Sequence, residues 1–273
     1  MQVINTNVSS LTAQRALAET QEAQRTAMER LSSGKRINHA KDDAAGMSVA
    51  ENMTSQIRTL NQAVRNSNDG ISYVQTAEGA LDEVSDMLQR IRELAVQADS
   101  GTLNSSQQDY IDLEVSALGA EIGNVISNTK YNDINVFTSG AQTLQAGWND
   151  SDTITIGVSA GLSSNLDTFI SFTGTAGSAD TKALTLSSVD TALDKVNEAR
   201  SKLGAQQNRL EHNASNLMNV SENLSAARSR VMDTDFAAES AELARTNVLQ
   251  QAGMAMLSQA NVSSQQVLML LGG

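Results

Sequence analysis

The fold is decided by residues 53–98, whose sequence is MTSQIRTLNQAVRNSNDGISYVQTAEGALDEVSDMLQRIRELAVQA. Apolar residues recur in it at alternating intervals of three and four, the spacing of an α-helix that presents an apolar seam to a partner helix, as in a coiled coil. One phase slip interrupts the seam, where Val74 and Ala77 follow Ile71. At ~1.5 Å per residue, a helix of roughly 55 residues spans about 80 Å, which is longer than a compact domain is wide. The stretch therefore predicts a rod of packed helices.

A second helix is predicted after Gly101, which ends the first one. Ser105 and Gln108 have the spacing of a capping box for its N-terminus, and apolar residues from Ile111 to Val125 repeat the seam. The helical spacing then stops, and it resumes over residues 189–231. These two stretches are the expected partners of the long helix.

Four polar residues stand at seam positions of the helix predicted over 189–231: Arg200, Gln207, Ser221 and Arg228. Polar residues at such positions weaken a coiled coil and can fix its register, and we expect them to do so here. Asp233 and Asp235 follow as candidate N-caps of a final helix.

Between the helical parts, residues 131–186 show short alternating runs such as Thr153–Ile156 and Phe169–Phe172. Turn clusters separate these runs, at Ser139-Gly140 and over residues 147–150 and 174–177. We expect a small β element here, with Trp148 packed in or beside it.

The distribution of charge sets the two ends of the chain apart. No charged side chain occurs from Met1 to Gln14 or from Thr246 to Gly273, although the second stretch is rich in apolar residues. Such ends do not resemble disordered tails; they are either helices docked on their own domain or a surface that other molecules must cover. Residues 99–180 carry ten acidic residues and one basic residue, Lys130, which is typical of a solvent-facing part. Because the ends share their composition, we expect them to lie side by side, with residues 131–186 at the far tip.

The composition excludes several functional classes. The chain has no Cys, and its two histidines are far apart in sequence, so neither a disulfide nor an imidazole metal cluster is expected. A net charge of −12 makes nucleic acid a poor partner. No apolar run reaches the roughly 20 residues of a membrane helix, and no pattern of a cleaved secretory signal is present. We expect no membrane insertion, no cofactor and no catalytic residues.

Three positions invite a more specific interpretation, and each has a simpler one. His39 is expected to be a solvated residue of a connector at 34–41, and His212 to be an exposed helix position. Asp42-Asp43 lacks the alternating oxygen ligands of a calcium loop and is interpreted as a helix start. The sequence also lacks the HExxH motif of a zinc peptidase.

Motifs at both ends of the chain resemble bacterial flagellin. In the N-terminal half they are Ile4–Asn7, Met28–Asn38 (MERLSSGKRIN), Asp42–Gly46, Met53–Arg58, Arg65–Ile71 (RNSNDGI), Gln75–Leu81 (QTAEGAL) and Gln89–Gln97. In the C-terminal part they are Asn247–Gly253 (NVLQQAG), Gln259–Asn261 and Val267–Leu271. The sequence departs from the family at 262–265, where flagellins commonly have a Pro, and at its final Gly272-Gly273, where many have Arg.

Together with the helical pattern, the resemblance implies a mainly α fold. This fold is a long antiparallel α-helical coiled-coil rod formed by the N- and C-terminal halves, with a small β element at the tip. Residues 1–41 and 233–273 would form the inner terminal coiled-coil domain of a filament core. Residues 42–130 and 187–232 would form the helical rod domain, and 131–186 its small β-rich part, without the variable outer domains of long flagellins.

The resemblance implies a structural subunit, not an enzyme, that is exported through a type III channel and polymerises into the extracellular flagellar filament used for swimming. The candidate subunit-packing residues are Ile4, Val8, Leu11, Leu243, Val248, Met254, Leu257, Leu268 and Leu271. The implied partners are further copies of the chain, the hook–filament junction and filament cap proteins, and an export chaperone on the C-terminal helix. Residues matching Arg90, Leu94 and Glu114 imply recognition by Toll-like receptor 5.

Two alternatives stay open at this point. A hook–filament junction protein shares the two-ended coiled-coil plan, although the motifs NVLQQAG, RNSNDGI and QTAEGAL favour flagellin. A surface protein that binds a polysaccharide or a host receptor would need a pocket with convergent aromatic and polar groups. An aromatic content of 3% argues against such a pocket as the main functional feature.

Overall fold

The computed structural model describes residues 6–158 and 186–271, with side chains described up to residue 262. The chain divides into two compact units, Met1–Ser55 with Asn223–Gly273, and Gln56–Glu222. We call them the terminal unit and the central unit. The runs Phe169–Phe172 and 174–177 lie outside the described residues.

Three long helices build the central unit. They are α2 (Ala44–Ala98), α3 (Ser105–Asn128) and α5 (Leu186–Met232), and the parts of α2 and α5 beyond the central unit belong to the terminal unit. The predicted length of the first helix is confirmed, since α2 has 55 residues. The predicted capping box at Ser105 and Gln108 is wrong by one residue: Asn104 is the N-cap, and the Gln107 side chain bonds back to its backbone. Asn precedes Ser105 and caps equally well, so the spacing alone could not choose.

The core of the central unit receives side chains from all three helices. Leu81 and Leu88 of α2, Ile122 of α3 and Leu203 and Leu210 of α5 are fully buried. They belong to one continuous apolar cluster, which extends to Val136, Phe137, Ile154 and Ile156 near the strands. The heptad-like spacing of the sequence is thus used to pack helix on helix.

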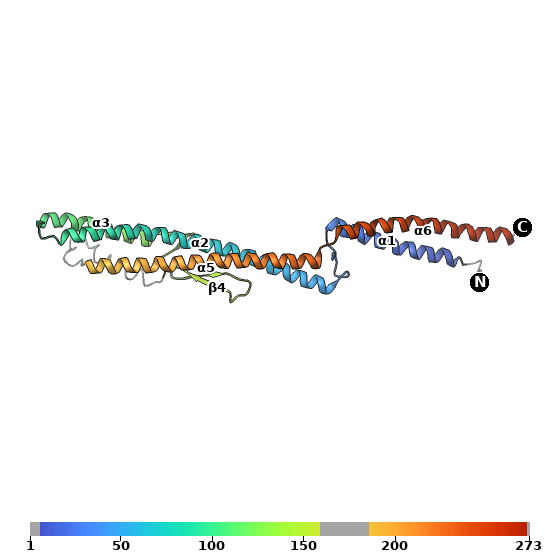
Figure 1. Cartoon of the computed structure of the whole chain (residues 1–273), viewed down its shortest axis with the longest axis horizontal. Coiled ribbons are helices and arrows are strands. Elements are labelled where there is room, and N and C mark those ends of the chain that lie inside the picture. Colours follow the sequence, from blue (N-terminus) through green and yellow to red (C-terminus); the bar gives the residue numbers. More distant parts are fainter. Residues whose placement is uncertain (1–5, 159–185, 272–273) are drawn as a thin grey trace. The chain divides into compact units, whose positions relative to one another are not determined.

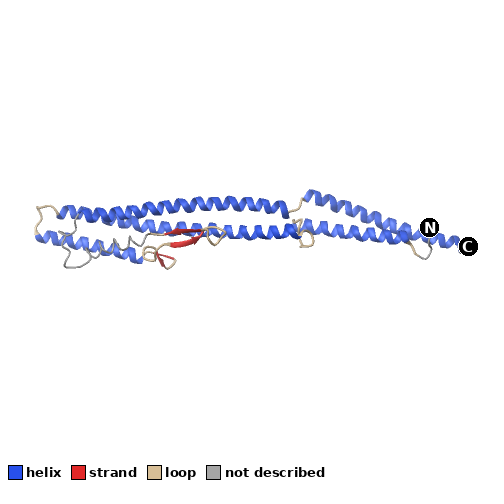
Figure 2. Ribbon diagram, turned by 90° about the horizontal axis from the view of Figure 1, so that it is seen from below, coloured by secondary structure: helices blue, strands red, loops and turns tan. Residues whose placement is uncertain are grey.

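Two short hairpins follow α3 in the chain. In the first, β1 (Lys130–Tyr131) pairs antiparallel with β2 (Ile134–Asn135) through Asn132 and Asp133, which adopt left-handed backbone angles typical of a two-residue hairpin turn. In the second, β3 (Gln142–Gln145) pairs with β4 (Thr153–Ile156), as predicted for Thr153–Ile156, and this hairpin lies beside the helices (Figure 2). The prediction that the β element lies at the tip is wrong: the turn between α2 and α3 forms that end of the central unit (Figure 1). Trp148 stands in the connection between β3 and β4 and is 54% exposed, so it lies beside the β element and not inside it.

Side-chain amides attach the second hairpin to α2 and α5. Asn66 donates to the carbonyl of Gln145, and Asn213 donates to the carbonyl of Ala146, at 3.0 and 2.9 Å. Because these bonds use backbone groups of the hairpin, they hold it in place without requiring particular hairpin side chains.

The four polar seam residues of α5 have different roles. Arg200 pairs with Asp82 at 2.9 Å, and the Ser221 hydroxyl donates to Asn61 Oδ1 at 3.1 Å, both across to α2 within the central unit. Arg228 contacts Thr54 of α2 within the terminal unit. Gln207 bonds only to Glu211 of its own helix among the described residues, so it ties α5 to no other element.

The terminal unit is built on two helices, α1 (Val8–Ser33) and α6 (Phe236–Leu271), which pack against each other (Figure 1). Asn7 caps α1 by accepting from the Ser10 amide. Of the two predicted caps of the final helix, Asp235 is the one used, since its Oδ1 accepts from the Ala237 amide at 2.9 Å. Asp233 accepts from Ser229 instead. No helix within residues 6–158 and 186–271 combines the length and the apolarity needed to cross a membrane.

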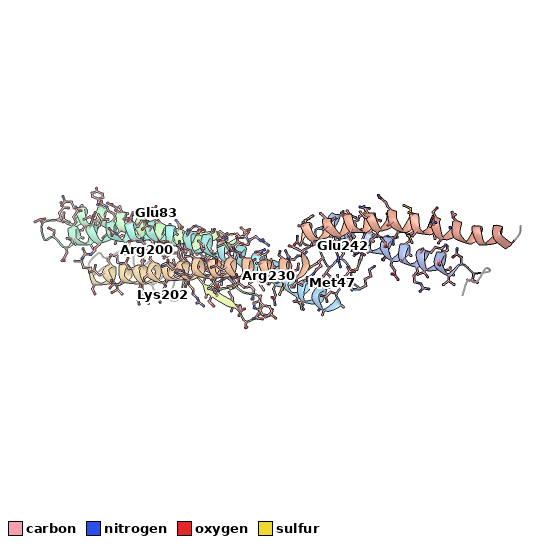
Figure 3. The ribbon with its side chains drawn as sticks, turned by 45° about the vertical axis from the view of Figure 1, so that its right-hand side comes forward. Met47, Glu83, Arg200, Lys202, Arg230 and Glu242 are labelled. Atoms are coloured by element: carbon pink, nitrogen blue, oxygen red, sulfur yellow. The ribbon has the colours of Figure 1, made fainter. Side chains whose placement is uncertain are left out.

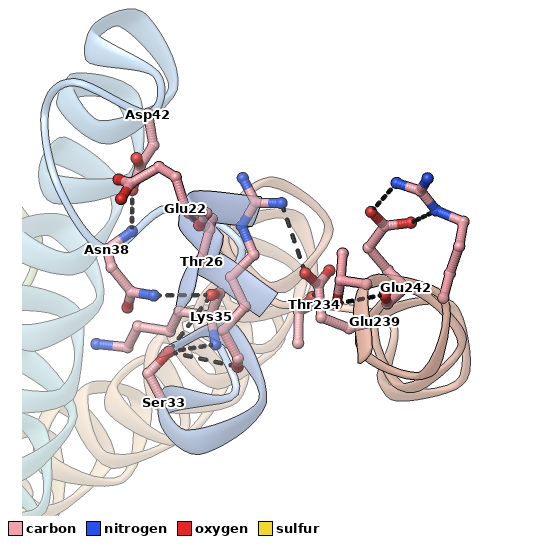
Figure 4. A network of polar contacts seen from close by, with 12 residues as sticks. Glu22, Thr26, Ser33, Lys35, Asn38, Asp42, Thr234, Glu239 and Glu242 are labelled. Atoms are coloured by element: carbon pink, nitrogen blue, oxygen red, sulfur yellow. Dashed lines mark hydrogen bonds and ion pairs between the residues drawn. The ribbon is translucent and has the colours of Figure 1, made fainter. Parts of the chain in front are cut away.

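The connector between α1 and α2 is held by polar contacts (Figure 4). Gly34 ends α1 with a left-handed backbone (φ 69°), and its carbonyl accepts from the Thr234 amide at 3.1 Å. The Asp42 carboxylate accepts from the backbone amides of His39 and Asn38, which lower its pKa. His39 is exposed, as predicted, and its Nε2 also lies 2.8 Å from Glu29 Oε1.

Candidate subunit-packing surface

The helices α1 and α6 run antiparallel, so the two uncharged ends of the sequence lie side by side. Asn7 donates to the carbonyl of Ala260 at 3.0 Å, and farther along the pair Gln24 donates to Asn247. Near the connector, Arg30 lies 3.8 Å from Glu239. Residues 6–14 therefore lie next to the uncharged part of α6, and the prediction that the two ends are neighbours is confirmed.

Small side chains are the most deeply buried part of the contact between α1 and α6. Ala27 and Thr246 are almost completely buried, each 1% exposed. A Cβ added at Gly253 would lie 3.4 Å from a methyl of Leu17, so the two helices are close at this point. Leu17, Leu243 and Leu257 are half-buried as well, but most of the larger apolar side chains lie on the outside of the pair.

These outward apolar side chains are numerous on both helices. In α1 and α6, those exposed by 40% or more are Val8, Leu11, Met28, Phe236, Val248, Leu249, Met254, Met256 and Val262. Single exposed apolar residues are ordinary, but this many on two adjoining helices are typical of surfaces that other molecules cover.

A groove of about 560 Å³ lies along one side of the pair. Its large lining residues are Val8 and Leu17 of α1 and Leu249 and Met256 of α6, and its floor includes Ala13, Ala16 and Gly253. No charged residue lines it. The groove can accept apolar side chains; Ser9, Thr12 and Thr20 line it with hydroxyls, but no His, Asp, Glu or Lys lies among its lining residues to act as a base beside them. Residues 6–158 and 186–262 contain no cluster of three His, Asp or Glu side chains able to hold a metal.

The structure places the sequence-predicted packing residues as follows. Val8, Leu11, Val248 and Met254 are exposed, whereas Leu243 and Leu257 are half-buried. The side chains of Ile4, Leu268 and Leu271 lie outside the described residues. Leu17, Leu249 and Met256 of the groove were not among the predicted packing residues, although Leu249 and Met256 belong to the uncharged apolar stretch that begins at Thr246. The small residues at 13, 16 and 253 were the only signal that a groove would form beside them.

The three residues predicted to meet a receptor lie in the central unit. Arg90 of α2 and Glu114 of α3 form an exposed ion pair, with Nη2 and Oε1 2.9 Å apart, and Glu114 raises the pKa of the Arg90 guanidinium. Arg90 also pairs with Glu93, at 3.0 Å. Leu94 is only 2% exposed and packs in the core. The exposed surface at this place is therefore formed by the charged pair.

Family comparisons decide what kind of protein carries this surface. Residues 4–143 match the bacterial flagellin N-terminal helical region, and residues 186–271 match the bacterial flagellin C-terminal helical region. The chain belongs to the flagellin family. A flagellin of Halalkalibacterium halodurans is 44% identical over 271 residues, which cover 98% of this chain and 99% of that protein. The flagellar filament 33 kDa core protein of Treponema phagedenis is 40% identical, with the same coverage of both chains.

A solved structure shares the fold of this flagellin chain at lower similarity. The structure of a putative flagellar hook-associated protein from Vibrio parahaemolyticus aligns with a TM-score of 0.57, covering 70% of this chain and all of that one, at 14% identity. At this identity the likeness concerns the fold alone. The choice between a flagellin and a hook–filament junction protein therefore depends on the sequence comparisons, and these favour flagellin.

Proposed function

We propose that the chain is a structural subunit of the bacterial flagellar filament and polymerises through the apolar surface of the α1–α6 pair. The observation that carries this proposal is the coincidence of two features on the same pair of helices. The uncharged ends of α1 and α6 lie side by side, and most of their large apolar side chains point outward. An enzyme is excluded as the family is structural.

The exposed apolar side chains favour the assembled state over the isolated chain. Complete burial of a fully exposed apolar side chain gains about 1.5–3 kcal/mol. The side chains on this surface are 42–65% exposed in the single chain, so each gains part of that amount on assembly. Because several of them lie on each copy, burial against neighbours supplies a large driving force, part of which is lost in ordering the helices. Contacts in which one patch meets a different patch on the next copy do not close on themselves and so generate a helical polymer.

The same proposal assigns a role in the filament to each part of the chain. Residues 1–41 and 233–273 would form the filament core, and 42–130 with 187–232 the surrounding helical rod, with 131–186 as its β-rich part. Type III export would deliver the subunit to the outside of the cell, where the filament serves swimming. The junction and cap proteins and an export chaperone on the C-terminal helix are further proposed partners.

Recognition by Toll-like receptor 5 is a separate proposal on the central unit. The exposed pair Arg90–Glu114 would provide the contact, and Leu94, buried beneath it, would support the helix that carries Arg90. Binding of the purified chain to the receptor ectodomain, compared with an Arg90→Ala and Glu114→Ala variant, tests it. Equal binding of both would refute it.

Electron microscopy of the purified chain after seeding with short filament fragments tests the proposed function. Long helical tubes whose growth consumes the monomer are expected. A monomer that stays monodisperse at all concentrations, with and without seeds, would contradict the proposal.

A further inference from the structure

Two ion pairs connect α2 with α5 in the central unit, and they are arranged reciprocally. Arg92 of α2 pairs with Asp190 of α5, with Nε and Oδ1 2.7 Å apart, and Arg200 of α5 pairs with Asp82 of α2 at 2.9 Å. On each helix the Asp precedes the Arg by ten residues. Because the helices are antiparallel, each Asp meets the Arg of the other helix. Figure 3 shows Arg200 on α5 beside the part of α2 that carries Glu83.

The apolar seam between these helices repeats too regularly to define one register. On α5 the buried aliphatic residues stand at strict intervals of seven: Val189, Val196, Leu203, Leu210 and Leu217. On α2 a buried column has the same interval: Leu60, Ser67, Val74, Leu81, Leu88 and Ala95. A slip of one heptad would again place aliphatic residues of α5 against buried positions of α2. The apolar contacts alone therefore discriminate weakly between neighbouring registers.

The ion pairs do discriminate between registers. A slip by seven residues in one direction would place Arg200 opposite Gln75 and Asp190 opposite Ser85. A slip in the other direction would place Arg200 opposite Gln89 and Asp190 opposite Asp99, a like charge. In both cases two attractive pairs are lost at once, and in the second case a repulsion is added.

Two charged residues near these pairs, Arg90 and Glu198, have partners of their own. Arg90 bonds to Glu114 of α3 and to Glu93, and Glu198 is held by Lys202 and Lys195 of its own helix. They are thus engaged in contacts that do not depend on how α5 lies against α2. The cross-helix charge pattern is therefore supplied mainly by the two reciprocal pairs.

From this geometry we propose that the reciprocal pairs Asp82–Arg200 and Arg92–Asp190 select the register of α2 against α5 from among heptad-shifted alternatives. The role of these four residues is positioning: they decide which of several similar apolar packings the chain adopts. A polymer built from identical subunits needs one register in every copy, because a slip of seven residues displaces one helix by about 10 Å. The inference concerns the single chain and does not depend on whether the chain forms filaments.

Disulfide trapping in the full-length chain measures the register directly. The chain has no Cys, so an introduced pair gives one interpretable cross-link. Asn61→Cys with Ser221→Cys reports the native register, because the two native side chains are within hydrogen-bond distance. Asn61→Cys with Ala214→Cys, and Asn68→Cys with Ser221→Cys, report slips of one heptad in the two directions. In the native register those two pairs are offset by about 10 Å along the helix, beyond the roughly 7 Å between Cα atoms that a disulfide spans.

The decisive variant exchanges the charges of α2 alone, Asp82→Arg with Arg92→Asp, so that the native register brings like charges together. We expect the ratio of native to slipped cross-links to fall by about tenfold, the scale for replacing two surface attractions by two repulsions. Adding Asp190→Arg and Arg200→Asp on α5 restores opposite charges and should restore the ratio. The matched control is Arg65→Asp with Asp69→Arg, an exchange on exposed positions of the same helix, which should leave the ratio unchanged.

The remaining outcomes are also decisive. An unchanged ratio in the α2 exchange would show that apolar packing sets the register, and an equal fall in the control would show a nonspecific effect of charge. If the α2 exchange unfolds the chain, as seen by circular dichroism, the fourfold variant decides: recovery of the native cross-link supports register selection by charge, and failure to recover overturns it.

Discussion

Gln206 of α5 holds both backbone groups of Gly157, just after β4: its Oε1 accepts from the Gly157 amide at 3.0 Å, and its Nε2 donates to the Gly157 carbonyl at 3.2 Å. Gly157 is buried and has a φ of 122°, a backbone conformation that residues other than glycine rarely adopt. The side-chain amide of Gln206 thus makes the two backbone hydrogen bonds that a neighbouring strand would otherwise make with Gly157.

Replacing Gln206 by Ala should loosen this end of the hairpin. Two buried backbone groups would lose their partners, at a cost of about 1–3 kcal/mol in the free energy of unfolding. Urea denaturation measures the loss, and amide exchange at Gly157 should become faster. The adjacent Gln207→Ala is the control, since Gln207 bonds to Glu211 of its own helix; equal effects of both variants would remove the special role of Gln206.

Two glycines of α2 should respond oppositely to Ala. A Cβ at Gly70 would lie 2.9 Å from a methyl of Leu144 and 3.2 Å from a methyl of Leu210, and nothing lies within 4 Å of one at Gly79. Gly70→Ala should therefore lower the unfolding free energy by about 1–3 kcal/mol through overpacking. Gly79→Ala should raise the unfolding free energy by about 0.5–1 kcal/mol, because Ala has less conformational entropy than Gly in the unfolded chain. Thermal or urea unfolding of the two variants checks the signs, and stabilisation by both would show that the hairpin yields at Gly70.

Introducing a charge into the apolar groove should stop assembly without unfolding the subunit. Met256 is 65% exposed in the single chain, so Met256→Glu should leave its unfolding free energy within about 0.5 kcal/mol. In the polymer an unpaired carboxylate would be buried, and the critical concentration for growth should rise by at least about tenfold. Sedimentation of seeded samples measures it. Gln21→Glu adds the same charge beside Glu22, where charge is already present, and should assemble normally.

The Glu198 carboxylate gives α5 a specific acid response. Hydrogen bonds from Lys202 and Lys195 lower its pKa from 4.5 to about 2. Since the folded-state pKa is depressed, the stabilising contribution is fully present above pH 4.5 and disappears as the pH falls towards 2. Lys202→Met should shift the pKa of Glu198 back towards its ordinary value. The carboxyl carbon chemical shift of Glu198, followed by NMR between pH 2 and 6, reports this change, and an unmoved titration would mean that Lys202 is not its partner in solution.

Much of the helical framework could be predicted because helices of this length depend on local spacing. The spacing of apolar residues by three and four over 53–98 predicted the end of α2, which lies at Ala98. Asp235, predicted as an N-cap, marks the start of α6. Predictions about single polar groups were weaker. His39 meets Glu29, and Asn104 displaces Ser105 as a cap, because several groups of equal chemistry compete within a few residues and only the folded backbone chooses among them.

The sequence by itself determined that the chain is built from long seamed helices and that its two ends carry apolar residues without charge. These properties depend on periodicity and composition, which no folding event changes. Only the tertiary structure decided which side chains α1 and α6 bury against each other, that Val248 and Met256 stay exposed, and that Met256 lines a groove. It also decided that Arg92 reaches Asp190 while Arg90 reaches Glu114, since neighbouring positions on one helix face different partner helices. Which partner each face meets is a property of the packed chain.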